Sequence, residues 1–291
     1  MKIWNQYLLP NTIDEAIRIL REKGGQARLI AGGTDLLLDI QQGRHPPVDT
    51  LVDITRIPEL QQIRFEGEEI HLGSAVTHRM ILGSEILREH ANCLQQACAG
   101  IGGSQVRNVA TIGGNVAHAL PAGDGSIALL ALNAQAKIIS DAGERWENLE
   151  DLFQGPGRAT FDPRRELLAD FRFPISKFGD RSGFHRVMRP QGVAIAILNM
   201  AIWLHQKDGG KISDVRIAVG PAGPVPARAR QTEEFLRDRE VDESVITQAT
   251  DILQKESMLR TSKHRATKEY RKHLLGYLLR TLIGNKSETR D

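Results

Sequence analysis

The pattern of apolar and polar residues predicts that the chain begins with alternating helices and strands. Thr12 and Glu15 have the spacing of a capping box, and an apolar stripe at helical spacing follows until Gly24–Gly25 ends it. The next expected elements are a short buried strand over 27–33, a helix capped by Asp35 and a strand over 50–54. We therefore expect a small α/β unit over residues 1–55.

Residues 56–175 continue with both kinds of pattern. Alternation of apolar and polar residues across short glycine-containing turns predicts hairpins, and longer apolar periodicity predicts helices. The expected elements are hairpins over 63–74 and 136–149, helices over 78–100 and 126–134, a loop over 150–165 and a strand over 166–174 that Pro174 ends.

The composition changes after residue 176, where strand patterns follow one another without helices between them. Three strands are expected over 183–187, 193–204 and 212–220, and three helices near 228–238, 241–256 and 264–283. Strands followed by helices predict a separate α+β domain over 176–291.

Composition and charge exclude several classes of protein. A chain of 291 residues with 41% hydrophobic residues, 25% charged residues and a net charge of +2 is typical of a globular protein and gives no electrostatic case for nucleic-acid binding. The longest apolar run, 193–204, is too short to span a bilayer and contains Asn199. Only two cysteines are present, Cys93 and Cys98, whereas an iron–sulfur cluster needs four ligands. Few cysteines and no signal peptide predict a cytoplasmic protein.

Two glycine-rich motifs are the main candidates for chemistry. They are "LIAGGTD" at 29–35 and "RNVATIGGNVAHALPAGDGS" at 107–126. A Gly–Gly turn lets the backbone approach a ligand, and its free N–H groups form a concave anion site, called a nest. Two nests from separate segments would suit a pyrophosphate, with Thr34, Thr111 and Asn115 as further donors and Asp124 as an acceptor for a ligand hydroxyl.

A purely structural role for these residues is the alternative, because glycine turns are common after strands. Arg107, Asn108 and His118 are open to the same interpretation. The segment "GDGSIA" at 123–128 nominally fits a dinucleotide-binding fingerprint, but a proline-containing segment precedes it instead of a strand.

The two motifs together, with further stretches along essentially the whole chain, resemble the flavin subunit of the molybdenum hydroxylases. This family includes the medium subunit of aerobic carbon monoxide dehydrogenase and the FAD portion of xanthine dehydrogenase. The resemblance implies an α+β fold of the vanillyl-alcohol-oxidase type (PCMH-type). In this fold two α/β subdomains, here 1–55 and 56–175, bind FAD and a C-terminal α+β domain follows, here 176–291.

The resemblance also implies which residues bind FAD. Ile101 takes the place of a large aromatic residue, and Arg186 takes the place of a common lysine. Leu167 would lie near the flavin ring, with strand core as its alternative, and a surface cation is the alternative for Arg186. The full expected set is Leu29, Ile30, Ala31, Gly32, Gly33, Thr34, Asp35, Ile101, Ala110, Thr111, Gly113, Gly114, Asn115, Gly123, Asp124, Leu167 and Arg186.

The function implied by the resemblance is electron transfer. A large subunit would carry the molybdenum cofactor, and a small subunit would carry two [2Fe–2S] clusters that pass electrons to FAD on this chain. FAD would then reduce an acceptor such as NAD⁺, and the flavin itself would supply the redox chemistry, so no catalytic acid, base or nucleophile and no metal site is expected. A stand-alone flavin oxidoreductase and an FAD-free assembly subunit are the alternatives.

Overall fold

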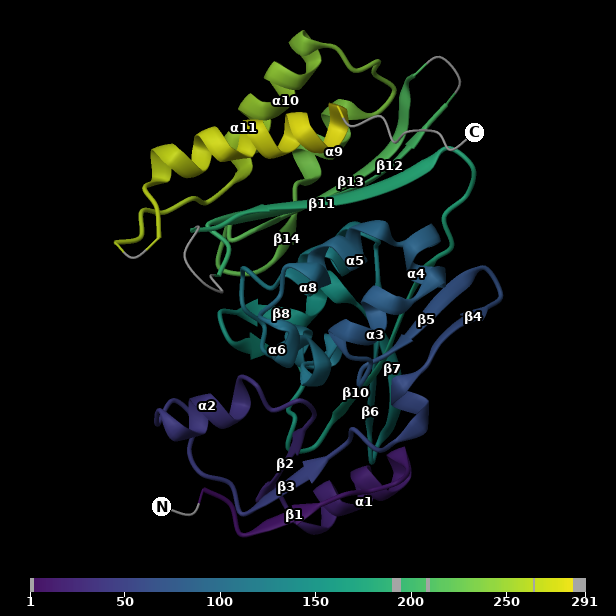
Figure 1. Ribbon diagram of the computed structural model, residues 1–291, viewed down its shortest axis with the longest axis vertical. Coiled ribbons are helices and arrows are strands. Elements are labelled where there is room, and N and C mark those ends of the chain that lie inside the picture. The colour runs from purple at the N-terminus through teal and green to yellow at the C-terminus, as the bar shows by residue number, and fades with distance from the viewer. Residues whose placement is uncertain (1–2, 190–194, 208–209, 264, 285–291) are drawn as a thin grey trace.

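Three sheets follow one another along the long axis of the computed structural model, which describes residues 3–189, 195–207, 210–263 and 265–284 (Figure 1). The first sheet is parallel and lies at the N-terminal end. Its strands, in spatial order, are β1 (Gln6–Leu8), β3 (Thr50–Asp53) and β2 (Ala27–Ile30). Two helices accompany it, α1 (Ile13–Glu22) and α2 (Leu36–Gln41).

The predicted start of the first helix is confirmed, whereas the predicted cap of the second is wrong. The Thr12 hydroxyl accepts a hydrogen bond from the Glu15 N–H at 3.2 Å, so α1 begins where the capping residues place it. Asp35 does precede α2, but its side chain makes no capping hydrogen bond. Its backbone is already helical, with φ −99° and ψ −48°, whereas a capping residue has extended backbone.

The second sheet is antiparallel and carries helices on one face. Its strands, in spatial order, are β4 (Ile63–Glu66), β5 (Glu69–Gly73), β10 (Leu167–Pro174), β6 (Gln135–Ser140) and β7 (Gly143–Asn148). The helices are α3 (His78–Gly83), α4 (Glu85–His90), α5 (Asn92–Ala99), α6 (Ser104–Val109), α7 (Ile112–Ala117) and α8 (Asp124–Ala131).

Two predictions for this region need correction. The helix expected over 78–100 is divided into α3, α4 and α5, because the chain leaves helical geometry at Ser84 and Ala91. The loop expected over 150–165 contains short regular elements. These are a 3₁₀ helix (Leu149–Leu152), β8 (Phe153–Gly155) and β9 (Arg158–Ala159), and a second 3₁₀ helix lies over Pro58–Gln61.

The third sheet is antiparallel and lies between two layers of helices. Its strands, in spatial order, are β11 (Asp180–Val187), β12 (Leu198–Gln206), β13 (Ile212–Gly220) and β14 (Ala227–Arg228), and its helices are α9 (Arg230–Leu236), α10 (Glu243–Glu256) and α11 (Lys268–Gly284). The order of strands then helices confirms the prediction for the C-terminal region. Residues 193–194 of the expected strand and residue 264 of the expected helix lie outside the described residues.

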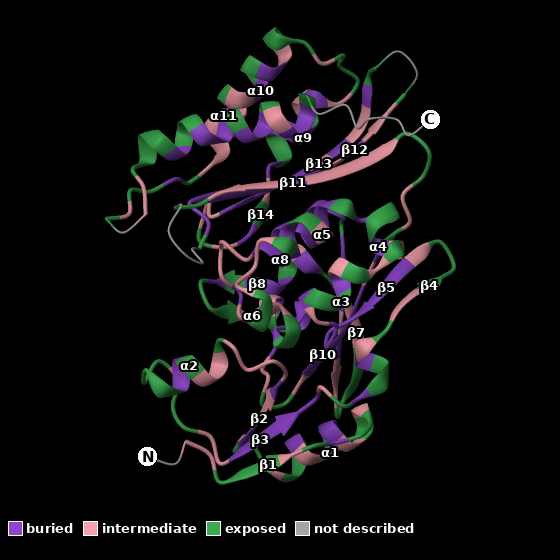
Figure 2. Ribbon diagram, in the orientation of Figure 1, coloured by how far each residue is buried: buried purple, intermediate pink, exposed green. Residues whose placement is uncertain are grey.

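The two faces of this sheet bury different cores. Along β12, Met200 and Ile202 pack with α9, α10 and α11, whereas Ala201 packs with the core of the second sheet. Helix α8 is buried along its whole length, because α5 and the C-terminal sheet cover it together (Figure 2). An apolar helix between two layers therefore joins the C-terminal sheet to the middle of the molecule.

The boundaries expected near residues 55 and 176 fall between these sheets, and the division into subdomains there stays a prediction. Within the described ranges, each helix is too short or too polar to cross a lipid bilayer.

Candidate functional site

The first glycine motif packs against the backbone of Val109 and Ala110, near the start of the second motif. A Cβ atom at Gly32 would lie 2.0 Å from the carbonyl oxygen of Val109 and 2.8 Å from the Cα of Ala110. On the other side of the loop, Asp35 lies 3.7 Å from His118, at the end of α7. The structure therefore brings the two motifs together, as the pyrophosphate hypothesis requires.

The first motif combines a glycine in the left-handed conformation with a run of backbone N–H groups. Gly33 has a φ of +66°, a conformation that favours glycine and turns the chain from β2 towards α2. Among the described residues, the backbone N–H groups of 31–36 have no hydrogen-bond acceptor. Because this loop is partly exposed, such donors are open to water or to a ligand, and a run of them suits the oxygens of a phosphate.

The second motif is not a nest, and this part of the prediction is wrong. Gly113 and Gly114 lie in the first turn of α7, whose N-cap is Thr111. The N–H groups of residues 112–115 already donate hydrogen bonds to the protein. The acceptors are Val76 O, Ser74 O, Thr111 Oγ1 and Thr111 O.

What α7 offers instead is an exposed glycine and the side chain of Asn115. A Cβ at Gly114 would meet only the Thr111 hydroxyl within 4 Å, so the surface beyond it is open. The Asn115 carbonyl oxygen accepts hydrogen bonds from the Ser126 N–H at 3.1 Å and the Ser126 hydroxyl at 3.3 Å, which ties α7 to the start of α8. Within the described residues the Asn115 amide N–H groups have no acceptor, so they remain available to a ligand.

Asp124 does not stand alone at the start of α8. Its carboxylate is 5% exposed and accepts hydrogen bonds from the Arg186 guanidinium and the Asn199 amide. Burial raises the pKa of the Asp124 carboxyl, and the charge of Arg186 and the hydrogen bond from Asn199 oppose that rise. Arg186 is thus the partner of a buried acid rather than the surface cation of the alternative interpretation.

Arg186 also links the expected residues near the flavin ring. Its guanidinium lies against Gly100, because a Cβ there would be 3.1 Å from Nε of Arg186. The next residue, Ile101, is half-buried and packs against the hydrophobic core between the second sheet and its helices. Asp124, Arg186 and Ile101, which are far apart in the sequence, therefore belong to one neighbourhood.

Leu167 lies elsewhere, in the core beneath the first motif. Its side chain is fully buried, and Leu29 and Ala31 pack against the same cluster. The core alternative is thus the one that the structure favours for Leu167. Ile30 is also buried, and its side chain lies beneath Gly33.

Two further residues contribute to this region. The role of Arg107 was left open by the sequence, and Asn199 was not predicted to contribute. Arg107 donates hydrogen bonds to the carbonyl oxygens of Ile101 at 3.0 Å and Gly102 at 2.7 Å, so it fixes the loop that carries Ile101. Asn199, which holds Asp124, was not in the expected set. Its one signal in the sequence is that it is a polar residue inside a long apolar run.

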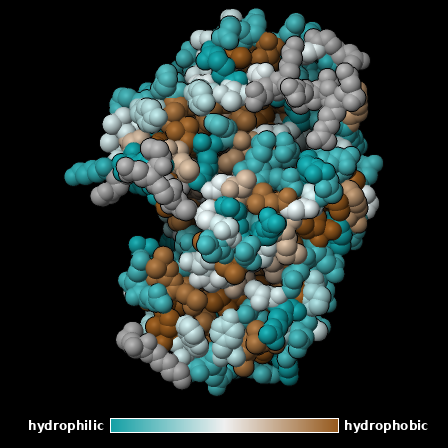
Figure 3. Space-filling model, viewed as in Figure 1, coloured by the Kyte–Doolittle hydropathy of each residue, from teal (hydrophilic) through white to brown (hydrophobic). Residues whose placement is uncertain are grey.

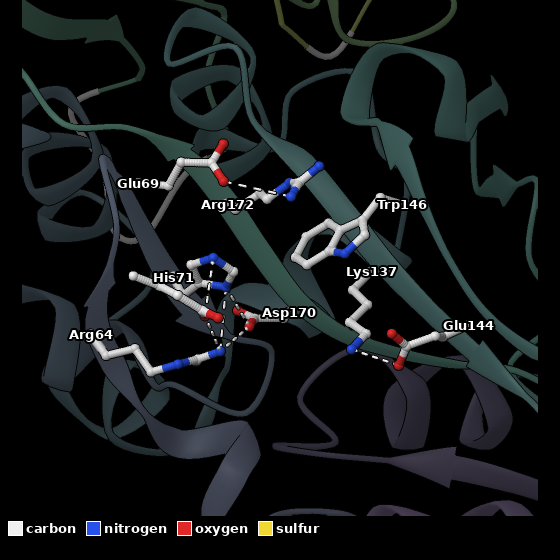
Figure 4. Close-up of a pocket in the computed structure, with 9 residues that line it drawn as sticks. Arg64, Glu69, His71, Lys137, Glu144, Trp146, Asp170 and Arg172 are labelled. Atoms are coloured by element: carbon white, nitrogen blue, oxygen red, sulfur yellow. Dashed lines mark hydrogen bonds and ion pairs between the residues drawn. The ribbon is translucent and has the colours of Figure 1, made fainter.

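The surface beside the first motif is hollowed, and a separate polar pocket lies on the second sheet. Figure 3 shows a notch at the left edge, between the region of α2 and the C-terminal part of the molecule. The polar pocket has a volume of about 340 Å³ and lies on the sheet face away from the helices (Figure 4). Many of its side chains contact one another, for example Arg64 with Asp170 at 2.9 Å and Arg172 over the ring of Trp146 at 4.3 Å, although the second carboxylate oxygen of Asp170 is buried without a hydrogen-bond partner among the described residues. Its lining contains none of the expected FAD-binding residues.

Two family models match consecutive parts of the chain. Residues 3–176 match the family model described as the FAD binding domain in molybdopterin dehydrogenase. Residues 183–285 match the model described as the CO dehydrogenase flavoprotein C-terminal domain.

Individual relatives cover most of the chain. The nicotinate dehydrogenase FAD-subunit of Eubacterium barkeri is 32% identical over 79% of both chains. The xanthine dehydrogenase FAD-binding subunit of Escherichia coli O157:H7 is 29% identical and covers 94% of this chain and 92% of its own. The solved structure of reconstituted CO dehydrogenase from Oligotropha carboxidovorans superposes with a TM-score of 0.90 at 26% identity, over 96% of each chain.

These matches together cover both the N-terminal and the C-terminal parts of the chain. The chain belongs to the FAD-binding flavoprotein subunits of the molybdopterin dehydrogenase family and is an FAD-dependent oxidoreductase subunit.

Proposed function

We propose that this chain passes electrons from the [2Fe–2S] clusters of a partner small subunit, through its FAD, to an acceptor such as NAD⁺. A partner large subunit would hold the molybdenum cofactor and oxidise the organic substrate. The observation that carries the proposal is the row of N–H donors at 31–36, which have no acceptor among the described residues, with Gly32 packed against Val109 and Ala110, in a chain of this family.

The residues present fit FAD, and each supplies a different kind of contact. The N–H donors from Ala31 to Leu36 would hold the pyrophosphate, with the Thr34 hydroxyl beside them. The Asn115 amide and the surface of Gly114 would border the same ligand. Asp124 and Arg186 would lie towards the sugar-alcohol and the ring, beside Ile101. The remaining expected contacts, those of Leu29, Ile30, Asp35, Ala110, Thr111, Gly113, Gly123 and Leu167, would act mainly by shaping the loops.

FAD, when bound, supplies one- and two-electron redox chemistry. The chain's own contribution is to bind and orient it. Main-chain dipoles stabilise the pyrophosphate charge without lysine or arginine, and the ion pair of Arg186 with Asp124 places fixed charges close to the cofactor.

The first test is uptake of FAD by the purified full chain. We expect one FAD per chain and flavin absorption bands at about 370 and 450 nm. A folded protein that stays colourless with added FAD would contradict the assignment and would favour the assembly-subunit alternative.

The second test addresses partners and acceptor. The chain is co-expressed with the genes of candidate large and small subunits, and under anaerobic conditions the complex is given a candidate organic substrate of the large subunit as the only electron donor. We expect the 450 nm band to bleach only when the [2Fe–2S] subunit is present, and NAD⁺ to restore it. Recovery with other acceptors but not with NAD⁺ would refute the acceptor while leaving the electron-transfer role intact. Bleaching by an organic substrate without any partner would instead indicate a stand-alone oxidoreductase.

A further inference from the structure

Two residues of the C-terminal sheet face the start of α8 from adjacent strands. Arg186 on β11 and Asn199 on β12 are direct register partners. Asn199 shares its face of β12 with Ala201, which packs into the main core, while Met200 points to the opposite core. The pair therefore projects from the C-terminal sheet towards the expected FAD-binding region.

Both residues act on the same acid. Arg186 donates to one carboxylate oxygen of Asp124, and the Asn199 amide donates to the other. The same amide nitrogen also donates to the carbonyl oxygen of Ala122 at 3.2 Å, which fixes the turn before α8. Asn199 is fully buried, so water does not substitute for its hydrogen bonds in the folded chain.

The arrangement matters because Asp124 is almost fully buried. A buried carboxylate is stable as an anion only when hydrogen-bond donors or cations satisfy it. Here both of the described donors to its side chain come from the C-terminal sheet, about 60 to 75 residues further along the sequence. The acid at the edge of the FAD site thus depends on a different part of the chain for its orientation.

We propose that Asn199 is a positioning residue of the FAD site: it holds the Asp124 carboxylate in place for the cofactor, and it makes the C-terminal sheet part of the binding site. This inference rests on the proposed function, since it requires that Asp124 borders FAD. Asn199 itself does not touch the cofactor and acts through Asp124.

The test is a double-mutant cycle on the full chain, with the FAD dissociation constant measured by flavin fluorescence. The Asn199→Leu variant keeps a similar volume and removes the donor. We expect it to weaken FAD binding about tenfold or more, as loss of a hydrogen bond to a charged group does. In an Asp124→Ala background, the same substitution should change the dissociation constant less than about twofold, because the group through which it acts is gone. The visible circular dichroism of any flavin still bound should also differ from that of the wild type.

A matched control separates positioning from general destabilisation. Met200→Ala alters the neighbouring residue of β12 on the opposite face, so it should lower the melting temperature without weakening FAD binding. If Asn199→Leu does not fold, Asn199→Ala replaces it in the cycle. Wild-type affinity in the single variant, or an equal loss in the Asp124→Ala background, would overturn the inference. Failure of the wild-type chain to take up FAD would instead refute the proposed function.

Discussion

Replacing Gly32 with alanine tests whether stability and FAD binding require the close backbone contact between the two glycine motifs. The added Cβ would lie 2.0 Å from the carbonyl oxygen of Val109 and 2.6 Å from its carbonyl carbon. Ordinary contacts of a Cβ begin near 3.4 Å, so the two segments would have to separate by more than 1 Å. Both groups in the clash are backbone, and neither has a rotamer that relieves it.

The expected cost follows from this geometry. Overpacking a tight contact typically costs about 1–3 kcal/mol, and a backbone clash belongs at the upper end of that range. The displaced segment includes Ala110, whose carbonyl oxygen accepts the His78 N–H at 3.1 Å and thereby anchors α3. Separation of the loops would also carry the donors of 31–36 away from α7. We therefore expect a loss of unfolding free energy of about 3 kcal/mol and FAD binding weakened at least tenfold.

Gly83→Ala provides a matched control, because it adds the same methyl group to a glycine with nothing within 4 Å. Gly83 ends α3, where alanine is the better helix former, so this variant should be neutral or slightly stabilised. Urea unfolding and FAD titration are measured on both variants. If Gly32→Ala had the same stability and FAD affinity as Gly83→Ala, the close contact between the two motifs would not be required, and the reasoning would be refuted.

Three further predictions follow from single side chains. Thr111→Ala removes the oxygen that accepts the Gly114 N–H at 3.0 Å and should cost about 1 kcal/mol in urea unfolding, whereas Thr111→Ser should cost little. Burial and the charge of Arg107 lower the pKa of His78 to about 4. In the unfolded chain the His78 imidazole binds a proton at about pH 6.5, so the free energy of unfolding should fall by about 3 kcal/mol as the pH drops from 6.5 to 4. An equally steep fall of the unfolding free energy with pH in His78→Gln would contradict this. Burial raises the pKa of the Cys93 thiol to about 12 and also raises that of Cys98, so neither should react with a thiol reagent at pH 8 until urea unfolds the protein; fast labelling of the native chain would disprove it.

The sequence allowed the first glycine motif to be predicted because its signals are local. An apolar strand and two glycines lie within seven residues, and each has a clear backbone meaning, whereas the capping role predicted for Asp35 was wrong. The same holds for α1, for the hairpins and for the strands followed by helices at the C-terminal end. In each of these, the residues that determine the element are also the residues that form it.

The second glycine pair shows where that reasoning fails. Glycine destabilises the interior of a helix, so a Gly–Gly pair by itself indicates a turn. In the structure, carbonyl groups of Ser74 and Val76 accept the N–H groups of Gly113 and Ile112, and the Thr111 hydroxyl accepts that of Gly114. Two of these three acceptors come from a segment more than thirty residues away. Tertiary contacts thus complete a helix that the local sequence disfavours.

The arrangement around Asp124 was harder to predict, although one residue carried a signal. Asn199 interrupts an apolar run, which by itself argues only against a membrane span. A polar side chain at a core position of a strand must find a partner, because an unpaired amide costs free energy when buried. The register that brings Arg186 beside Asn199 depends on how β11 pairs with β12, and the partner Asp124 lies on a helix 75 residues earlier. The existence of a buried partner is therefore predictable from such a residue, whereas the partner's identity requires the fold.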